Sequence, residues 1–128
     1  MTLNGVLIAI VDDDASVCRA LKRLVRSFGY ASEAFSRGEE FLERLASLQS
    51  FRPDCVVLDM HMPGLSGLEV QQRLAHTALP VIFITAHDEP GLREKVVAAG
   101  AVALLRKPFD DELFIQTLSG ALSRSGDR

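Results

Sequence analysis

Short, almost wholly apolar segments recur along the chain, separated by longer stretches of mixed polarity. Four of them, residues 6–11, 55–58, 81–84 and 101–105, are rich in Val, Ile and Leu and show no polar alternation. Such runs are typical of strands buried on both faces of a parallel sheet. A fifth segment, residues 30–35, is weaker and alternates, which suits an edge strand. The pattern therefore predicts five strands.

Amphipathic segments with helical spacing lie between and after these strands, and capping residues mark several of their ends. The predicted helices are residues 15–28, a segment capped by Ser36 that buries Phe41, Leu42, Leu45 and Leu48, residues 67–75 capped by Ser66, residues 90–100, and a last segment capped by Asp110. Residues 123–128 are polar, and we expect them to fray.

Five successive strand-then-helix units predict an α/β fold, a doubly wound five-stranded parallel sheet with helices on both faces. We expect the flavodoxin-like strand order 2-1-3-4-5. The 128 residues, 48% of them hydrophobic, suit a single domain with one sizeable core. We expect this core to cover about residues 5–123, with 124–128 as a tail or the start of a linker.

Charge and hydropathy narrow the range of functions. The formal net charge is -3 and the charged residues are interspersed, so direct binding of nucleic acid by this chain is not expected. The first residues do not resemble a signal peptide, and the longest apolar run is too short to cross a bilayer. We expect a cytoplasmic protein in which Cys18 and Cys55, which lack metal-ligand spacing, are reduced and buried.

Residues with functional chemistry follow the predicted strands at their carboxyl ends. They are Asp12, Asp13 and Asp14 after the first strand, Asp59 at the end of the third, Thr85 at the end of the fourth, and Lys107 after the fifth. Doubly wound sheets bind ligands outside the carboxyl ends of their strands. We therefore expect these side chains to meet at one edge of the sheet.

Three clustered carboxylates need a compensating cation. Two carboxylates about 4 Å apart repel each other by ~4 kcal/mol at an effective dielectric near 20. Ligands that are all oxygen select a hard ion, and Asp12, Asp13 and Asp59 together suit Mg2+. Alternatively, aspartates at this place cap the following helix, which fits Asp14 but does not require three of them.

Lys107 and Thr85 are candidates for binding phosphate at the same edge. A lysine ammonium can hold a phosphate oxygen while it balances the acidic cluster, although a plain salt bridge would explain it too. The Thr85 hydroxyl can donate a hydrogen bond, although a threonine in a strand is commonly satisfied by backbone.

Four blocks of sequence resemble the signature blocks of response-regulator receiver domains. They are IVDDD at 10–14, LDMHMPGLSGL at 58–68, ITAH at 84–87 and KPFD at 107–110, in family order within residues 7–122. The sequence PVIFIT at 80–85, together with the Pro63-Gly64 segment, is most similar to the FixJ-type subfamily. Members of that subfamily usually carry a LuxR-type helix-turn-helix output domain, so a DNA-binding domain can follow in the full protein.

The resemblance implies a role for each site residue. Asp59 matches the phosphoacceptor, which receives a phosphoryl group from a sensor histidine kinase. Asp13 and Asp59 match direct Mg2+ ligands, Asp12 a ligand acting mainly through water, and His61 a position whose backbone carbonyl binds the metal. Thr85 and Lys107 match the hydroxyl and the ammonium that contact the phosphoryl group. The resemblance also suggests that the Lys107-Pro108 bond is cis.

One position departs from the family pattern. Leu104 stands three residues before Lys107, where the family often has Tyr or Phe, so an aromatic switch is not expected. We expect the response to appear instead as a backbone shift of residues 88–100 and of the face formed with strand 101–105 and the last helix, which could expose a homodimer interface. His61 and His87 each follow a site residue by two and either border the phosphoryl group or are simply solvated.

Two other functions compete with that of a phosphorylated switch. One is a phosphatase of the haloacid-dehalogenase type, whose DxD pattern is present in 12–14, but which would leave Asp59 and Lys107 unexplained and lacks room for a cap domain. The other is a receiver that binds proteins without being phosphorylated, against which the presence of Asp59, Thr85 and Lys107 argues. We expect a signalling domain and not an enzyme that acts on a free metabolite.

Overall fold

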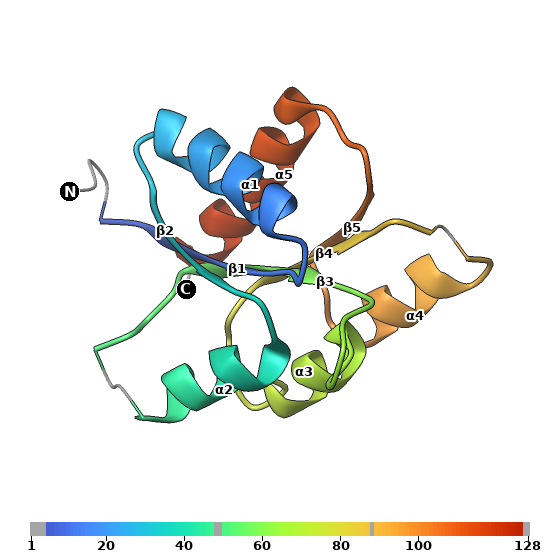
Figure 1. Ribbon diagram of the computed structural model, residues 1–128. Coiled ribbons are helices and arrows are strands. Elements are labelled where there is room, and N and C mark those ends of the chain that lie inside the picture. Colours follow the sequence, from blue (N-terminus) through green and yellow to red (C-terminus); the bar gives the residue numbers. More distant parts are fainter. Residues whose placement is uncertain (1–4, 48–49, 88, 127–128) are drawn as a thin grey trace.

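The computed structural model describes residues 5–47, 50–87 and 89–126. Strands and helices alternate along the whole of this range (Figure 1). The elements are β1 (Leu7–Val11), α1 (Ala15–Ser27), β2 (Ala31–Phe35), α2 (Gly38–Ser47), β3 (Cys55–Asp59), α3 (Gly67–Arg73), β4 (Val81–Thr85), α4 (Leu92–Ala98), β5 (Ala103–Arg106) and α5 (Asp111–Gly126). All five predicted strands are present, each within two residues of its expected ends.

The five strands form one parallel sheet in the order β2-β1-β3-β4-β5, which confirms the predicted topology. The register pairs Val11 with Leu58 and Asp59 with Ile84, so the carboxyl ends of β1, β3 and β4 lie side by side. Strands β1, β3 and β4 are buried almost throughout, whereas β2 is only half-buried, as its alternating sequence indicates.

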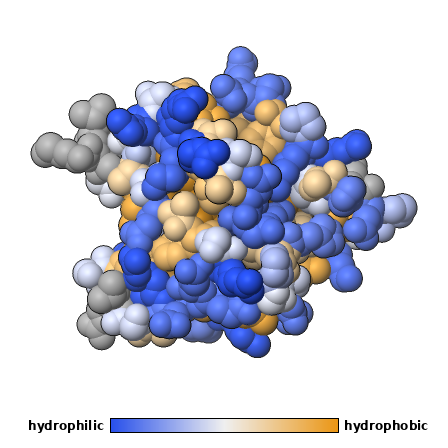
Figure 2. All heavy atoms as spheres, viewed as in Figure 1, coloured by the Kyte–Doolittle hydropathy of each residue, from blue (hydrophilic) through white to orange (hydrophobic). Residues whose placement is uncertain are grey.

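Helices α1 and α5 cover one face of the sheet, and α2, α3 and α4 cover the other (Figure 1). Alternate side chains of each strand therefore enter two different clusters: Ile8 and Ile10 pack with α1 and α5, and Ala9 and Val11 with α2 to α4. Apolar atoms show mainly between the two helical layers, and hydrophilic residues cover most of the face seen in Figure 2. None of the described helices is both long enough and apolar enough to cross a membrane.

The helix ends agree with the sequence in three places and differ in others. Asp14, Ser66 and Asp110 cap their helices as predicted, and Ser66 forms a full capping box with Glu69. Ser36 does not cap α2: this helix begins at Gly38, and the Ser36 hydroxyl donates to the Glu40 carboxylate.

Further helix ends differ from expectation, and α3 ends at Arg73, two residues before the expected end. Helix α4 is shorter than the expected 90–100 and begins at Leu92. Helix α5 runs to Gly126, past residue 123, where we expect the chain to begin to fray. Leu48 lies outside the described residues.

Candidate phosphoacceptor and metal site

Three carboxylates meet where β1 and β3 end. Ligand oxygens of Asp12, Asp13 and Asp59 all lie within 4.8 Å of one another. Asp12 is 1% exposed and Asp59 4%, whereas Asp13 faces solvent. The structure thus brings together the acidic residues that the strand-end pattern selects, and leaves the cluster open on the side of Asp13.

Lys107 lies between the two buried carboxylates. Its Nζ is 2.9 Å from Oδ2 of Asp12 and 3.4 Å from Oδ1 of Asp59. The other oxygen of Asp12, Oδ1, accepts the backbone N–H of Asp14 at 2.8 Å. Asp14 in turn caps α1 by accepting the N–H groups of Ser16 and Val17. The start of α1 is therefore fixed to the acidic cluster through consecutive hydrogen bonds.

The buried position of Asp59 raises the pKa of its carboxyl group to about 6. Burial is the largest cause, and the charge of Asp12 adds to it. The charge and hydrogen bond of Lys107 and a hydrogen bond with the His61 backbone oppose this shift. For Lys107, burial lowers the pKa, but the hydrogen bond to Asp12 and the charge of Asp59 outweigh it, so its pKa is raised. One ammonium thus contacts two of the three clustered carboxylates.

This donor set fits Mg2+. All the clustered side-chain ligands are carboxylate oxygens, the kind that a hard divalent cation prefers, and their charge exceeds that of Lys107. The imidazole of His61 is not part of the cluster, because it is exposed and its Nε2 lies 3.5 Å from Glu89 Oε1. Any contribution of His61 to a metal would come from its backbone.

Thr85 is fully buried at the end of β4, and its hydroxyl faces the next loop. The hydroxyl donates to the backbone carbonyl of His87 at 2.9 Å and accepts the His87 N–H at 3.2 Å. The Lys107 N–H donates to the Thr85 carbonyl at 2.7 Å, which joins the ends of β4 and β5. The bond from Lys107 to Pro108 is cis, as predicted.

Gly67 and Cys18 also support the cluster, in ways that the sequence did not predict. A Cβ on Gly67 would lie 2.4 Å from the backbone oxygen of Asp59, so this position has no space for a side chain. The signal was the Ser66-Gly67 pair at the start of a helix. The Cys18 thiol donates to the Asp12 carbonyl at 3.3 Å. Cys18 and Cys55 are free and buried, as predicted, and burial raises the pKa of both thiols.

An apolar groove of about 420 Å³ lies next to Lys107, between α1 and the start of α5. Val17 and Leu24 of α1 form one wall, and Pro108 and Phe109 form the other. The ring of Phe109 stacks on the buried Phe114 at 5.5 Å between centroids, which holds this wall in place. Lys107 itself lines this groove, so the groove adjoins the acidic cluster.

Comparison with solved structures supports the same fold. A response regulator receiver protein from Burkholderia phymatum is 57% identical, with a TM-score of 0.86, over 92% of this chain and 95% of that one. Full-length FixJ from B. japonicum is 32% identical, also with a TM-score of 0.86, over 99% of this chain and 61% of that one.

Curated proteins of similar sequence are longer than this chain. The response regulator protein TmoT of Ectopseudomonas mendocina is 39% identical over 118 residues, 91% of this chain and 52% of that protein. The transcriptional regulatory protein FixJ of Bradyrhizobium diazoefficiens is 34% identical over 98% of this chain and 60% of that protein. The chain thus spans about half the length of the curated relatives it matches. Residues 8–119 match the response regulator receiver domain family as a whole, and the chain belongs to that family.

Proposed function

We propose that this receiver domain is a phosphoacceptor switch, in which Asp59 takes a phosphoryl group from the phosphohistidine of a sensor histidine kinase. The observation that carries the proposal is the position of Asp59. Its carboxylate is buried at the end of β3, beside Asp12 and Asp13 and 3.4 Å from the Lys107 ammonium. A carboxylate in such a place can attack phosphorus while neighbouring charges stabilise the transferred group.

Different residues of the chain have different roles in this transfer. As one Asp59 oxygen bonds to phosphorus, the bond from phosphorus to the kinase histidine breaks, and Lys107 can shift from the carboxylates to a phosphoryl oxygen. Asp12, Asp13 and Asp59, with the His61 backbone carbonyl, would hold Mg2+, which when bound neutralises charge on the phosphoryl oxygens. Because Asp59 is the acceptor, the product is an acyl phosphate on the protein.

Release of the Thr85 hydroxyl from His87 would couple phosphorylation of Asp59 to a movement of the chain at the surface. The hydroxyl would leave His87 and turn to the phosphoryl group, which frees the chain between β4 and α4. Leu104, buried on the neighbouring strand β5, has no ring and no polar tip to follow this movement. We therefore place the output on α4, β5 and α5, as a backbone shift that favours a homodimer.

The cellular setting follows from the same proposal. The kinase would dock on the apolar groove between α1 and α5, which leads to Lys107. One relative is named a transcriptional regulatory protein, which supports control of a DNA-binding output in the same or another polypeptide. The domain would work in the cytoplasm as a signalling component and not as an enzyme for free metabolites.

Intact-mass analysis after incubation with acetyl phosphate and Mg2+ tests the proposal. We expect one added phosphoryl group on the wild type and none on Asp59→Asn. Asp54→Asn serves as a control on the amino-terminal side of the same strand, and it should be labelled like the wild type. Labelling of Asp59→Asn, or no labelling of any protein, would contradict the assignment.

A further inference from the structure

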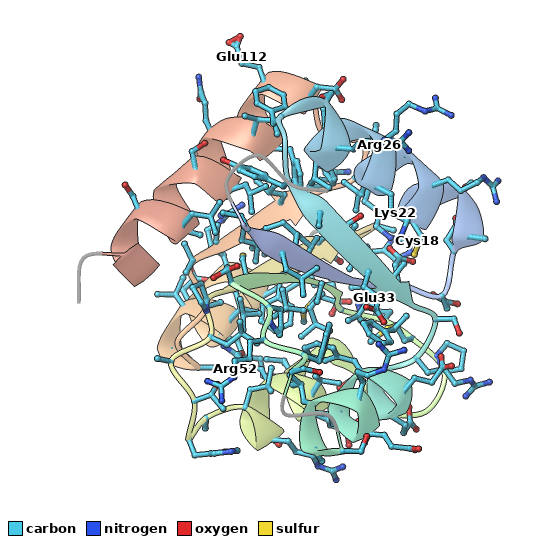
Figure 3. All side chains as sticks on the ribbon, turned by 90° about the vertical axis from the view of Figure 1, so that its left-hand side faces the viewer. Cys18, Lys22, Arg26, Glu33, Arg52 and Glu112 are labelled. Atoms are coloured by element: carbon cyan, nitrogen blue, oxygen red, sulfur yellow. The ribbon has the colours of Figure 1, made fainter. Side chains whose placement is uncertain are left out.

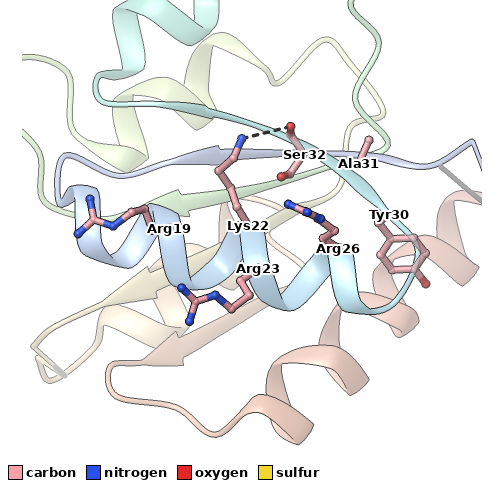
Figure 4. Close-up of a pocket in the computed structure, with 7 residues that line it drawn as sticks. All are labelled: Arg19, Lys22, Arg23, Arg26, Tyr30, Ala31 and Ser32. Atoms are coloured by element: carbon pink, nitrogen blue, oxygen red, sulfur yellow. Dashed lines mark hydrogen bonds between the residues drawn. The ribbon is translucent and has the colours of Figure 1, made fainter. Parts of the chain in front are cut away.

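A second concave site lies away from the carboxylates, between α1 and the edge strand β2 (Figure 4). It is a groove of about 530 Å³, a size usual for sites that bind small molecules. Four cationic residues of α1 line it: Arg19, Lys22, Arg23 and Arg26. Tyr30, Ala31 and Ser32 complete the lining from the β2 side.

The groove carries a concentrated positive charge in a chain whose formal net charge is -3. The sequence of α1 contains no acidic residue, and none of the described residues that line the groove is acidic. Glu33 of β2 points to the other side of the sheet, where it pairs with Arg44 of α2 (Figure 3). Across the described part of the chain, none of the four cations forms an ion pair.

The spacing of these cations places them on one face of the helix. Arg19 is three or four residues from Lys22 and Arg23, and Arg26 is likewise three or four residues from both. Like charges at these spacings repel each other and destabilise a helix. From Arg19 to Arg26, seven residue steps along the helix, the four charges fall within about 10 Å along the axis, so an anion must carry several charges in a short length to match them.

The groove has the chemistry to bind such an anion. Three of the four cations are arginines, whose planar forks bind phosphate oxygens in pairs. The Lys22 ammonium donates to the Ser32 carbonyl at 3.5 Å, and an ammonium has three N–H groups with which to bind oxygen. Figure 4 shows the Tyr30 ring beyond Arg26, at the end of the row of cations, where a flat group could stack on it.

We propose that this groove binds a small oligophosphate. A partner helix is about 10–12 Å across with its side chains and would rest on the rim, whereas a chain of phosphates can enter between α1 and β2. A long nucleic acid would also meet the net negative charge of the rest of the domain. The phosphates could come from a nucleotide, with its base on Tyr30, or from inorganic oligophosphate.

Tyrosine fluorescence can follow this site selectively, because Tyr30 is the one tyrosine of the chain and there is no tryptophan. The whole chain would be titrated with inorganic tripolyphosphate and with a nucleoside triphosphate, in EDTA so that the carboxylate cluster recruits no metal, and the affinities checked by calorimetry. We expect sub-millimolar binding that weakens with salt. A nucleotide that binds roughly tenfold more tightly identifies the base as part of the ligand, and equal affinities identify inorganic oligophosphate.

Charge variants make the test specific. Arg23→Gln with Arg26→Gln removes two exposed cations of the groove, and we expect the affinity to fall roughly tenfold or more. Arg73→Gln, on α3 and on the opposite face of the sheet, removes a charge elsewhere and should bind like the wild type. The proposal is overturned by three results: no binding at millimolar concentration, an equal loss in Arg73→Gln, or tighter binding of an oligoglutamate peptide, which would assign the groove to an acidic protein.

Discussion

The Thr85 hydroxyl is engaged twice by the same residue, donating to the carbonyl of His87 at 2.9 Å and accepting its N–H at 3.2 Å. To donate to a phosphoryl group on Asp59, as we propose, the hydroxyl must first release the His87 carbonyl. Beryllofluoride with Mg2+, which mimics the phosphoryl group, should therefore shift amide NMR signals through residues 89–105, beyond the ligand contacts. Asp88, where the expected movement begins, lies outside the described residues.

A Thr85→Ala variant provides the control for this experiment. It should still bind beryllofluoride at Asp59, but the shifts in α4 and β5 should be much smaller, because the hydroxyl that links the site to the loop is gone. If the signals of residues 89–105 stay unchanged in the wild type as well, the proposed output face is wrong.

The stability of the metal-free domain should fall as the pH rises through the titration of Asp59. The pKa of this group is raised from an ordinary value of 3.8 to about 6 on folding. Between these values the folded protein keeps a proton that the unfolded chain has lost, so folding becomes less favourable, by on the order of 2–3 kcal/mol. Asp59→Asn removes this penalty.

Urea unfolding in EDTA measures the effect. We expect Asp59→Asn to exceed the wild type in free energy of unfolding by about 1–3 kcal/mol at about pH 7.5, and by little near pH 4. Asp13→Asn, at an exposed member of the same cluster, should show a smaller gain. A difference between Asp59→Asn and wild type that does not depend on pH would contradict the raised pKa.

Removal of Lys107 should move the pKa of Asp59 further upwards. The charge and hydrogen bond of Lys107 both lower that pKa, whereas burial and the charge of Asp12 raise it. Lys107→Gln removes the lowering charge, so the pKa of Asp59 should rise. We expect the carboxyl carbon of Asp59 to titrate above pH 6 in the variant, with a loss of about 1–3 kcal/mol in stability at neutral pH. Labelling by acetyl phosphate should slow as well. An unchanged titration would show that Lys107 does not contact Asp59 in solution.

Gly67 should not tolerate a methyl group. In Gly67→Ala the new Cβ would meet the Asp59 carbonyl at 2.4 Å and the Phe83 ring at 2.9 Å, and neither can move freely. We expect the variant to lose about 1–3 kcal/mol or more. Gly120→Ala, inside α5 with nothing within 4 Å of its new Cβ, should instead gain about 0.5–1 kcal/mol. Thermal unfolding of the two variants compares them, and similar melting temperatures would contradict the close approach.

His61 and His87 are expected to tune the lifetime of the acyl phosphate. Both side chains are exposed and stand two residues after Asp59 and Thr85, where attacking water would pass. Alanine at both positions should change the rate of dephosphorylation and leave the requirement for Mg2+ unchanged. His76→Ala, at an exposed position after α3, should decay like the wild type. A double variant that is dephosphorylated at the wild-type rate would show that neither histidine affects the lifetime of the acyl phosphate.

The sequence predicts the strands and the strand-end site residues well, because both depend on residue type and position along the chain. Buried strands have a simple apolar signature, and parallel strands bring Asp12, Asp59 and Lys107 to one edge whatever their rotamers. Orientation is different: the sequence puts Thr85 at the site but does not say that its hydroxyl faces His87. The helical spacing of the four cations puts them on one face of α1, but the groove exists because this face lies beside residues 30–32, which the sequence alone does not show.

The central place of β3 has a consequence for hydrogen exchange. This strand lies between β1 and β4 with both faces covered, and all five of its residues are buried. Its amides should be among the slowest to exchange with deuterium, close to the limit set by global unfolding, whereas amides around His87 and Glu89 should exchange by local opening. On this expectation Asp59 stands at the end of a slowly exchanging strand, whereas the segment that we propose responds to it exchanges faster.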